Sequence, residues 1–548
     1  MKKLLLGDEA VALGAIYAGL SGVYAYPGTP STEITEFIQN NALARERGIR
    51  SRWCTNEKTA MEAALGMSYA GKRALVCMKH VGMNVCADAF VNSAVTGVNG
   101  GLVVLAADDP SMHSSQNEQD SRFYGKFAMI PIFEPSTQQE AFSMIGEAFD
   151  LSEKLGEPVL FRVVTRLAHS RAAVEIGELR DQNKFNPATG KGWILLPGIA
   201  RRQYVSLIGK QEAMAAAAEE SVHNRLEGEI LRYAQDDKKG QDDKKGQDDK
   251  KGQDDKKAPL GVIACGIAYN YVCEAGADNV LKISQYPLPE KKIKELAARS
   301  QSILVVEDGQ PVVEQDVKAI LGAGYKIEGR LTGRLPRTGE LNPDNVAAAL
   351  GAEPGKGFAP AANLAARPPQ LCPGCGHRDV YNALNKVAAE YPGARIFGDI
   401  GCYTLGALPP FQSLSSCVDM GASITMAKGA ADAGLFPAIA IIGDSTFTHS
   451  GMTGLLDAVN DHSNITVVIS DNLTTAMTGG QDSAGTSKFE AICLGLGVEP
   501  EHLHVVNPIA PNMEAITQII RQEIEYNGVS VIIPRRECMQ TLRRHSKK

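Results

Sequence analysis

Short apolar runs that end in polar residues recur along the chain and alternate with segments of helical periodicity. In the first 180 residues, one segment with helical spacing extends from Thr59 to Ala70. The apolar runs of this region are Gly22–Tyr26, Ala74–Met78, Leu102–Ala106 and Pro158–Val164. Strands that alternate with helices in this way form parallel sheets with crossover helices. The pattern therefore predicts an α/β fold.

The alternation resumes twice further along the chain. Gly261–Ala264 and Ile303–Val306 are the expected strands of a second region, and a third region begins near residue 368. We therefore expect a multidomain α/β protein with doubly wound parallel sheets. The expected domains span residues 1–180, 190–355 and 365–548.

A low-complexity repeat interrupts the second region. Between Gln235 and Lys257 the sequence Gln-Asp-Asp-Lys-Lys occurs four times, without one apolar side chain. A charge-balanced tract of this kind cannot bury a core. We therefore expect residues 235–257 to form a disordered insertion without a catalytic role, and the helix-rich pattern of 205–234 before it is harder to place.

In the third region, two apolar runs end at side chains that carry oxygen. Ala438–Ile442 ends near Asp444, and Ile465–Ile469 ends near Asn472, with one helical segment between them. A right-handed crossover brings the carboxyl ends of two such strands together, so both side chains are expected to reach one hard cation. A Mg²⁺ ion that holds a diphosphate fits this expectation. The alternative interpretation is that Gly-Asp and Asp-Asn are ordinary turns.

Composition and charge narrow the class of protein. The 548 residues are 44% hydrophobic and include 54 glycines, which fits several α/β domains with ample cores. The net charge of −7, without a basic stripe, argues against nucleic-acid binding. Asp8 and Glu9 interrupt the N-terminal apolar run, and no apolar run reaches membrane-spanning length. A cytoplasmic location without a membrane partner is expected.

Eleven cysteines are scattered through the chain, which does not resemble a secreted disulfide framework. Only Cys372 and Cys375 form a close pair. A single Cys-Pro-Gly-Cys sequence can bind zinc, contribute to an iron–sulfur centre or form a turn.

The spacing of Gly443, Asp444 and Asn472 is similar to the diphosphate-binding motif of thiamine diphosphate enzymes, with Ser445 at the position of the second glycine. Further passages that resemble one family lie at 26–33, 53–71, 79–84, 114–122, 372–377, 398–402 and 478–481. The family is that of the 2-oxoacid:ferredoxin oxidoreductases, and the large (alpha) subunits of its indolepyruvate ferredoxin oxidoreductases are the most similar group. The resemblance covers the chain except about 205–257.

The resemblance implies that thiamine diphosphate lies between the first and third domains. Its Mg²⁺ would be bound by the side chains of Asp444 and Asn472 and by the backbone carbonyl of Thr474. The other residues expected to contact the cofactor are Gly401, Cys402, Gly443 and Ser445.

The resemblance also implies a [4Fe-4S] cluster held by Cys372, Cys375, Cys402 and Cys538. Zinc bound by the same thiols is the alternative. The cluster is favoured because the chain has only one close cysteine pair.

Three residues are expected to act on the substrate or cofactor. Glu57 would form a hydrogen bond with the ring nitrogen of the aminopyrimidine and so promote removal of the thiazolium proton. The alternative interpretation of Glu57 is that it is an ordinary first-turn glutamate, which the helix dipole favours. Glu62, in the middle of the helix, is a less favoured candidate for the catalytic role. Arg122 would bind the substrate carboxylate, or form a surface ion pair, and Thr29 would line the same pocket. Pyruvate-specific relatives carry an asparagine near the position of Met477, and an apolar side chain at this position favours an aryl substrate.

The implied reaction is oxidative decarboxylation of an arylpyruvate such as indolepyruvate to an arylacetyl-coenzyme A, with electrons passed to ferredoxin. The related subunits end in a ferredoxin domain with eight cysteines, and this sequence has no such run of cysteines, so the electron relay is expected to reside in another polypeptide or to be missing. The expected partners are a small beta subunit, ferredoxin, coenzyme A and the 2-oxoacid, within a hetero-oligomer. The alternatives are a non-oxidative thiamine-dependent decarboxylase and a non-catalytic assembly subunit stabilised by zinc.

Overall fold

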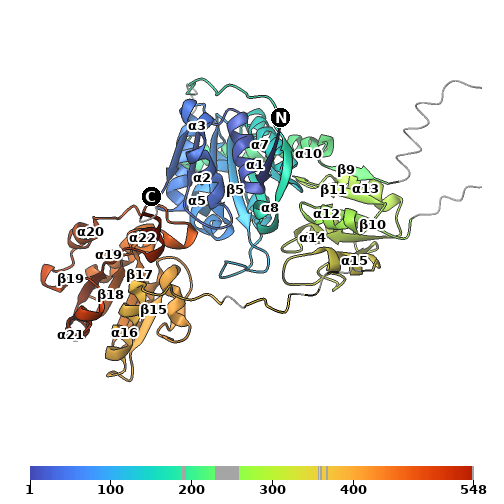
Figure 1. Ribbon diagram of the computed structural model, residues 1–548. Coiled ribbons are helices and arrows are strands. Elements are labelled where there is room, and N and C mark those ends of the chain that lie inside the picture. Colours follow the sequence, from blue (N-terminus) through green and yellow to red (C-terminus); the bar gives the residue numbers. More distant parts are fainter. Residues whose placement is uncertain are drawn as a thin grey trace, which may run out of the picture. The chain divides into compact units, whose positions relative to one another are not determined.

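A computed structural model of the chain describes residues 1–187, 193–228, 258–353, 355, 357, 359, 361–365 and 368–545 (Figure 1). The chain divides into two compact units, Met1–Phe358 and Ala359–Lys548. The repeat at 235–257 lies outside the described residues.

A seven-stranded sheet forms the centre of the first unit. Its strand order is β12-β6-β7-β5-β4-β2-β3, and neighbouring strands are parallel except β12 and β6. The strands are β2 (Gly22–Ala25), β3 (Arg50–Trp53), β4 (Ala74–Lys79), β5 (Leu102–Asp108), β6 (Ile132–Phe133), β7 (Val159–Val164) and β12 (Gln285–Tyr286). The four apolar runs predicted as strands in this region are confirmed as β2, β4, β5 and β7.

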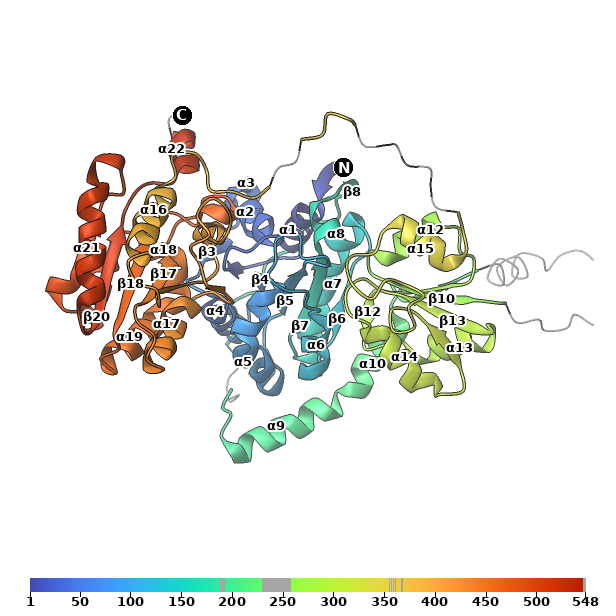
Figure 2. The same ribbon diagram turned by 90° about the horizontal axis from the view of Figure 1, so that it is seen from below.

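Helices cover both faces of this sheet, as Figures 1 and 2 show. Leu75 and Cys77 of β4 belong to the core formed with α1 (Gly7–Tyr17) and α7 (Gln138–Leu155). Val76 and Met78 belong to the core formed with α4 (Glu57–Tyr69) and α5 (His80–Thr96). Successive side chains of a strand point to opposite faces, so a strand covered on both sides is apolar throughout. The predicted doubly wound arrangement is confirmed.

A second sheet of the first unit is built mainly from residues after 224. Its order is β14-β13-β10-β11-β9, with only the edge strand β9 antiparallel. The strands are β9 (Arg225–Glu227), β10 (Gly261–Cys265), β11 (Val280–Ile283), β13 (Ser302–Val306) and β14 (Lys326–Glu328). Strand β12 comes from this same region but pairs with β6 of the first sheet. The regions expected as the first two domains therefore share a sheet edge within one compact unit.

The first unit contains further elements around these sheets. They are the paired strands β1 (Lys2–Leu6) and β8 (Arg171–Glu175), and the helices α2 (Thr32–Asn40), α3 (Ala42–Glu46), α6 (Arg122–Ala128), α8 (Thr165–His169), α9 (Pro197–Gly209), α10 (Gln211–Glu220), α12 (Ala268–Glu274), α13 (Glu290–Ala298), α14 (Val312–Leu321) and α15 (Pro343–Leu350).

The second unit contains a six-stranded, wholly parallel sheet of order β16-β15-β17-β18-β20-β19. The strands are β15 (Arg395–Gly398), β16 (Ser416–Cys417), β17 (Ala438–Gly443), β18 (Ile465–Ser470), β19 (Leu503–Val506) and β20 (Val529–Pro534). Ile439 and Ile441 of β17 pack with α16 (Gly376–Ala388) and α21 (Met513–Glu525). Ala440 and Ile442 pack with α17 (Ala422–Asp432) and α19 (Met452–Asn460) on the opposite face. This sheet is also doubly wound.

The short helices of the second unit are α18 (Asp444–Thr446), α20 (Phe489–Gly495) and α22 (Met539–His545). One turn of π-helix, Phe447–Gly451, joins α18 to α19. Across the ranges that the structure describes, no helix has both the length and the apolar character needed to cross a membrane.

Candidate active site

The ends of β17 and β18 lie side by side at the carboxyl edge of the sheet in the second unit. Gly443 is aligned with Ser470 across these two parallel strands. The backbone amide of Thr474 donates to Oδ2 of Asp444 at 3.1 Å and to Oδ1 of Asn472 at 3.2 Å. Both side chains thus reach one backbone amide, because strands joined by a right-handed crossover end at the same edge.

Asp444 is a buried carboxylate in a setting that favours a bound cation. Burial, together with the nearby carboxylate of Asp471, raises the pKa of Asp444 to about 7. The backbone amides of Ser445, at 2.8 Å, and Thr474 oppose this rise. A cation beside the carboxylate would remove most of the cost of holding its charge away from water. The oxygen donors of this edge therefore fit Mg²⁺.

A buried histidine holds the side chain of Asn472 in place. Nδ1 of His377 lies 2.7 Å from Oγ of Ser470, and Nε2 lies 3.4 Å from Nδ2 of Asn472. Burial lowers the pKa of His377 to about 4, so the ring is neutral near pH 7. With the proton on Nδ1, His377 donates to Ser470 and accepts from the amide of Asn472. This arrangement leaves Oδ1 of Asn472 facing Thr474 and available to a metal.

The loop after Asn472 folds back onto the segment after β17. The hydroxyl groups of Thr475 and Ser445 lie 3.0 Å apart, and the hydroxyl of Thr474 donates to the carbonyl of Gln481 at 3.0 Å. Met477, the side chain considered for aryl specificity, is 59% exposed on this loop. The loop therefore holds Asn472, Thr474 and Ser445 close together, and all three are expected to contact the metal or the cofactor.

One aromatic ring supports two of the glycine motifs. A Cβ atom added at Gly401 or Gly443 would lie 2.3 or 2.6 Å from Cε1 of Tyr403, so no larger residue fits at either position without movement of that ring. The Tyr403 hydroxyl donates to Asp399, which also accepts from the hydroxyl of Ser423 at 2.6 Å. Burial raises the pKa of Asp399 to about 7. Asp399 and Tyr403 thus fix the backbone that carries both motifs.

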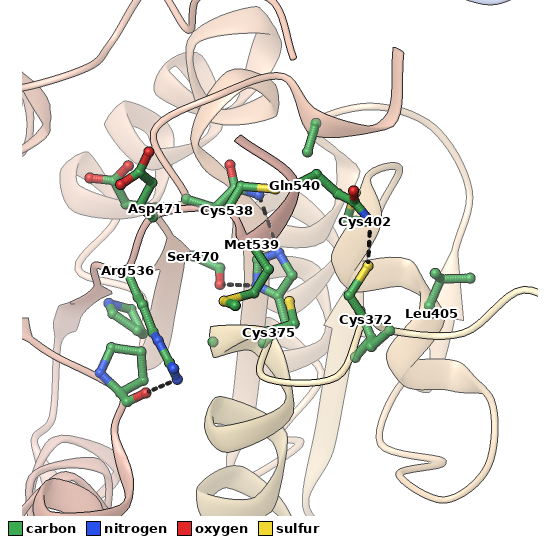
Figure 3. A pocket seen from close by; sticks show the side chains of 18 of the residues that line it. Cys372, Cys375, Cys402, Leu405, Ser470, Asp471, Arg536, Cys538, Met539 and Gln540 are labelled. Carbon is green, nitrogen blue, oxygen red and sulfur yellow. Dashed lines mark hydrogen bonds between the residues drawn. The ribbon is translucent and has the colours of Figure 1, made fainter. Parts of the chain in front are cut away.

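All four cysteines expected to bind a cluster line one cavity of about 150 Å³ in the second unit (Figure 3). Cys372 and Cys375 flank a turn in which the amide of Cys375 donates to the carbonyl of Cys372 at 3.1 Å and Gly374 has a φ of +79°. Burial raises the pKa of Cys402 to about 12, with Cys538 and then the other two thiols adding to the rise. Thiols from three separate segments therefore converge, as a shared metal centre requires.

The spacing of the four sulfur atoms bears on the kind of metal centre. In the described part of the chain, no three of these sulfurs lie within 4.8 Å of one another. Tetrahedral zinc, with Zn–S bonds of about 2.3 Å, needs sulfurs roughly 3.8 Å apart. In a [4Fe-4S] centre each thiolate binds a different iron, so the sulfurs are further apart. The sulfurs are thus further apart than the ligands of a formed zinc site.

The cysteine cavity and the Asp444 site share residues. Asn472 and His377 line the cavity. The backbone amide of Cys538 donates to the backbone carbonyl of Asn472 at 3.1 Å. A direct backbone hydrogen bond therefore links Asn472, an expected magnesium ligand, to Cys538, the fourth expected cluster ligand.

In the first unit, Glu57 is the first residue of α4, two residues earlier than the helical pattern indicated. Asn56 caps this helix, and its side chain accepts a 2.9 Å hydrogen bond from an amide of the first turn. Glu57 is buried, and a Cβ atom at Gly82 would lie 2.6 Å from its Oε1. Glu62, by contrast, is 47% exposed and pairs with Lys58. Glu57 has the enclosed setting of a reactive carboxyl, and Glu62 has the setting of a surface residue.

Thr29 lies half-buried in the loop between β2 and α2. A Cβ atom at the preceding Gly28 would lie 3.1 Å from Cβ of Lys79. The Lys79 ammonium donates to the carbonyl of Ser114 at 2.6 Å. Burial lowers the pKa of Lys79 to about 8, although the carboxylate of Asp109 opposes this shift. Three of the passages that resemble the family therefore meet at Lys79.

The structure places Arg122 differently from the expectation. It is fully buried, and its guanidinium pairs with Asp120 at 2.6 Å and with Glu307 at 2.9 Å. It also donates to the carbonyl of Gln310 at 3.0 Å. These contacts join α6 to the segment after β13, and they satisfy a charge that would otherwise be costly to bury. We therefore assign Arg122 to a buried ion network rather than to the substrate carboxylate or a surface ion pair.

Two family models match the chain. The family described as pyruvate flavodoxin/ferredoxin oxidoreductase, thiamine diP-bdg, matches residues 13–192. The C-terminal TPP binding domain of thiamine pyrophosphate enzymes matches residues 399–533. The first match includes Glu57, and the second includes Asp444 and Asn472.

Whole-chain relatives decide the family. The chain is 38% identical to the indolepyruvate oxidoreductase subunit IorA of Archaeoglobus fulgidus, over 98% of this chain and 86% of that protein. The chain belongs to the family of indolepyruvate oxidoreductase subunits IorA. A further family member, from Methanothermobacter thermautotrophicus, is 36% identical over 98% of this chain and 87% of its own length. The family resemblance and the thiamine-diphosphate-binding α/β fold expected from the sequence are confirmed.

Among solved structures, a 2-oxoglutarate:ferredoxin oxidoreductase from Magnetococcus marinus is similar to part of the chain. It shares 16% sequence identity, with a TM-score of 0.47, over 60% of this chain and 62% of that chain.

The sequence did not assign a role to three residues that shape the site. They are His377, Asp399 and Tyr403. His377 and Asp399 stand inside motifs that resemble the family, which is the signal that could have selected them. His377 contacts Ser470 and Asn472, and Asp399 accepts from Ser423, so these roles depend on the tertiary structure.

Proposed function

We propose that this chain is the thiamine-diphosphate-binding large subunit of an enzyme that oxidatively decarboxylates an arylpyruvate such as indolepyruvate. The products would be an arylacetyl-coenzyme A and electrons passed to ferredoxin. The observation that carries the proposal is that the backbone amide of Thr474 donates to the side chains of both Asp444 and Asn472, beside a cavity lined by four cysteines. The names of the relatives, indolepyruvate oxidoreductases, support the substrate class.

Asp444 and Asn472 would hold Mg²⁺ through side-chain oxygens, and Thr474 through its backbone carbonyl. The raised pKa of the buried Asp444 carboxyl supports this role, because a dication would compensate the charge of the carboxylate. The residues that would contact the diphosphate or the rest of the cofactor are Gly401, Cys402, Gly443 and Ser445.

When bound, thiamine diphosphate supplies an acidic carbon that attacks the 2-oxo group and an electron sink for the decarboxylation. Glu57 would donate a hydrogen bond to the aminopyrimidine ring and so assist proton removal from that carbon. Its close contact with Gly82 supports the role, because a fixed carboxyl keeps one orientation. Thr29 would contact the substrate.

Cys372, Cys375, Cys402 and Cys538 would hold a [4Fe-4S] cluster that accepts electrons singly. The convergence of the four thiols on one cavity supports a shared metal centre. We further propose a small beta subunit, ferredoxin and coenzyme A as partners, within a cytoplasmic hetero-oligomer, since the relatives are themselves named as subunits.

The test is an anaerobic assay of the chain produced together with a small beta subunit of the same family. We expect ferredoxin reduction that requires both indolepyruvate and coenzyme A, with indolylacetyl-coenzyme A as product. Release of the aldehyde without ferredoxin reduction would identify a non-oxidative decarboxylase instead. Absence of thiamine diphosphate binding, with zinc in place of iron, would identify an assembly subunit.

A further inference from the structure

A separate group of metal-binding side chains lies in the first unit and contains none of the residues assigned above. Asp8 lies in the first turn of α1, Glu33 in the first turn of α2, and His169 is the last residue of α8. One ligand atom from each residue lies within 4.8 Å of the other two. Two carboxylates and one imidazole, from residues far apart in the sequence, therefore lie close together in the structure.

The condition of Asp8 is a second, independent observation. Asp8 is fully buried, and within the described part of the chain neither of its carboxylate oxygens has a hydrogen-bond partner. Oε2 of Glu33 is likewise buried without a partner among the described residues. A carboxylate that lies out of water and accepts no hydrogen bond is costly to bury. A cation shared by the two carboxylates would satisfy both.

The group is open to solvent on one side. The side chains of Glu33 and His169 are 37% and 35% exposed, and Oε1 of Glu33 lies 3.6 Å from Nε2 of His169. Tetrahedral coordination with bonds of about 2.1 Å places ligand atoms roughly 3.4 Å apart. The three ligand atoms therefore lie close to coordinating distance, and the exposed sides of Glu33 and His169 give an ion access to them.

We propose that Asp8, Glu33 and His169 form a three-ligand site for a divalent transition metal, with Zn²⁺ as the probe. Mg²⁺ and Ca²⁺ prefer oxygen ligands only, and Cu⁺ prefers sulfur, so two carboxylates with one imidazole select a borderline dication such as Zn²⁺. Water would complete the coordination. The ion would tie the first turns of α1 and α2 to the end of α8, and would brace the loop before α2 that contains Thr29.

The test compares zinc binding between the full chain and matched variants. After removal of metals by a chelator, Zn²⁺ is titrated back and the bound equivalents are measured by equilibrium dialysis and metal analysis. We expect Asp8→Asn and His169→Gln each to lose one equivalent relative to the unaltered chain. The control is His113→Gln, which removes an imidazole that is 50% exposed and lies 3.4 Å from Glu340. The four cysteines contribute equally in all variants, so the difference reports only this site.

Thermal unfolding adds a readout with a defined sign. In chelator, Asp8→Asn should raise the Tm, because it removes the repulsion between the carboxylates of Asp8 and Glu33. With Zn²⁺, the rise in Tm should be larger for the unaltered chain than for Asp8→Asn. Equal zinc stoichiometry in the unaltered chain and in His169→Gln would overturn the proposal, and so would a Zn²⁺-soaked crystal without an anomalous peak between the three side chains. His169 lies near the surface, so its variant decides the matter even where Asp8→Asn fails to fold.

Discussion

The backbone amide of Cys538 donates a 3.1 Å hydrogen bond to the backbone carbonyl of Asn472. One of these residues is an expected cluster ligand, and the other is an expected magnesium ligand. His377 makes a second link. It follows Cys375 by two residues, and its ring lies within hydrogen-bond distance of the side chain of Asn472. A displacement of the cysteine segments would therefore be passed through these hydrogen bonds to Asn472, a ligand of the proposed magnesium site.

The first prediction concerns Cys538→Ser. We expect iron and acid-labile sulfide to fall to background in anaerobically prepared protein, because a serine oxygen is a poor substitute for a thiolate. The Kd for thiamine diphosphate with Mg²⁺ should rise about 10-fold, the size of effect seen when a supporting contact of a metal ligand is lost. The control is Cys273→Ser, an exposed cysteine of the first unit. Unchanged iron content in Cys538→Ser would contradict the ligand assignment.

The second prediction concerns Glu57→Gln. Loss of the carboxyl should lower kcat by about 10²- to 10⁴-fold, the range for general acid–base groups, with cofactor affinity changed only a few-fold. Steady-state kinetics and cofactor titration measure the two quantities separately. Glu62→Gln in the same helix is the matched control and should keep the kcat of the unaltered enzyme, since Glu62 pairs with Lys58 at the surface. Full turnover in Glu57→Gln would remove Glu57 from the mechanism.

The third prediction concerns His377. In His377→Leu the amide of Asn472 loses its acceptor, so the Kd for Mg²⁺ in the presence of thiamine diphosphate should rise about 10-fold. His377→Gln can still offer hydrogen bonds to Ser470 and Asn472 and should restore most of the affinity. Calorimetric titration with Mg²⁺ measures both variants. Equal affinity in the Leu variant and the unaltered chain would show that His377 does not position Asn472.

The hydrophobic pattern predicted the strands well, because strands buried on both faces are continuously apolar. The runs at 438–442 and 465–469 became β17 and β18, and their adjacency followed from the crossover rule. The meeting of Asp444 with Asn472 could therefore be predicted from the sequence.

The role of Arg122 could not be predicted in the same way. Its partners Glu307 and Gln310 are contributed by a different sheet, and no local pattern records that contact. The same holds for His377, whose partners follow it by more than ninety residues. Local periodicity reports which face of an element is buried, and it does not report which distant polar group the face meets.

The fourth prediction is a pH dependence at Lys79. Burial lowers the pKa of Lys79 to about 8, while a lysine in the unfolded chain titrates near 10.4. Between these values the unfolded state binds more protons, so the Lys79 contribution to the free energy of unfolding increases with pH and is lost as pH falls through 8. Lys79→Met should remove this part of the increase. Urea unfolding of both proteins at pH 8 and pH 10 measures it, and an identical pH dependence in the two proteins would contradict the shifted pKa.

The carboxylate of Asp444 is central to the proposed magnesium site. Calorimetric titration of the chain with thiamine diphosphate in the presence of Mg²⁺ should give saturable binding that weakens by roughly 100-fold in Asp444→Asn, as expected for loss of one charge from a buried ion contact. The exposed carboxylate of Asp482 provides the control, and Asp482→Asn should bind like the unaltered chain. Binding of equal strength in Asp444→Asn and the unaltered chain would contradict the proposed magnesium site and, with it, the proposed function.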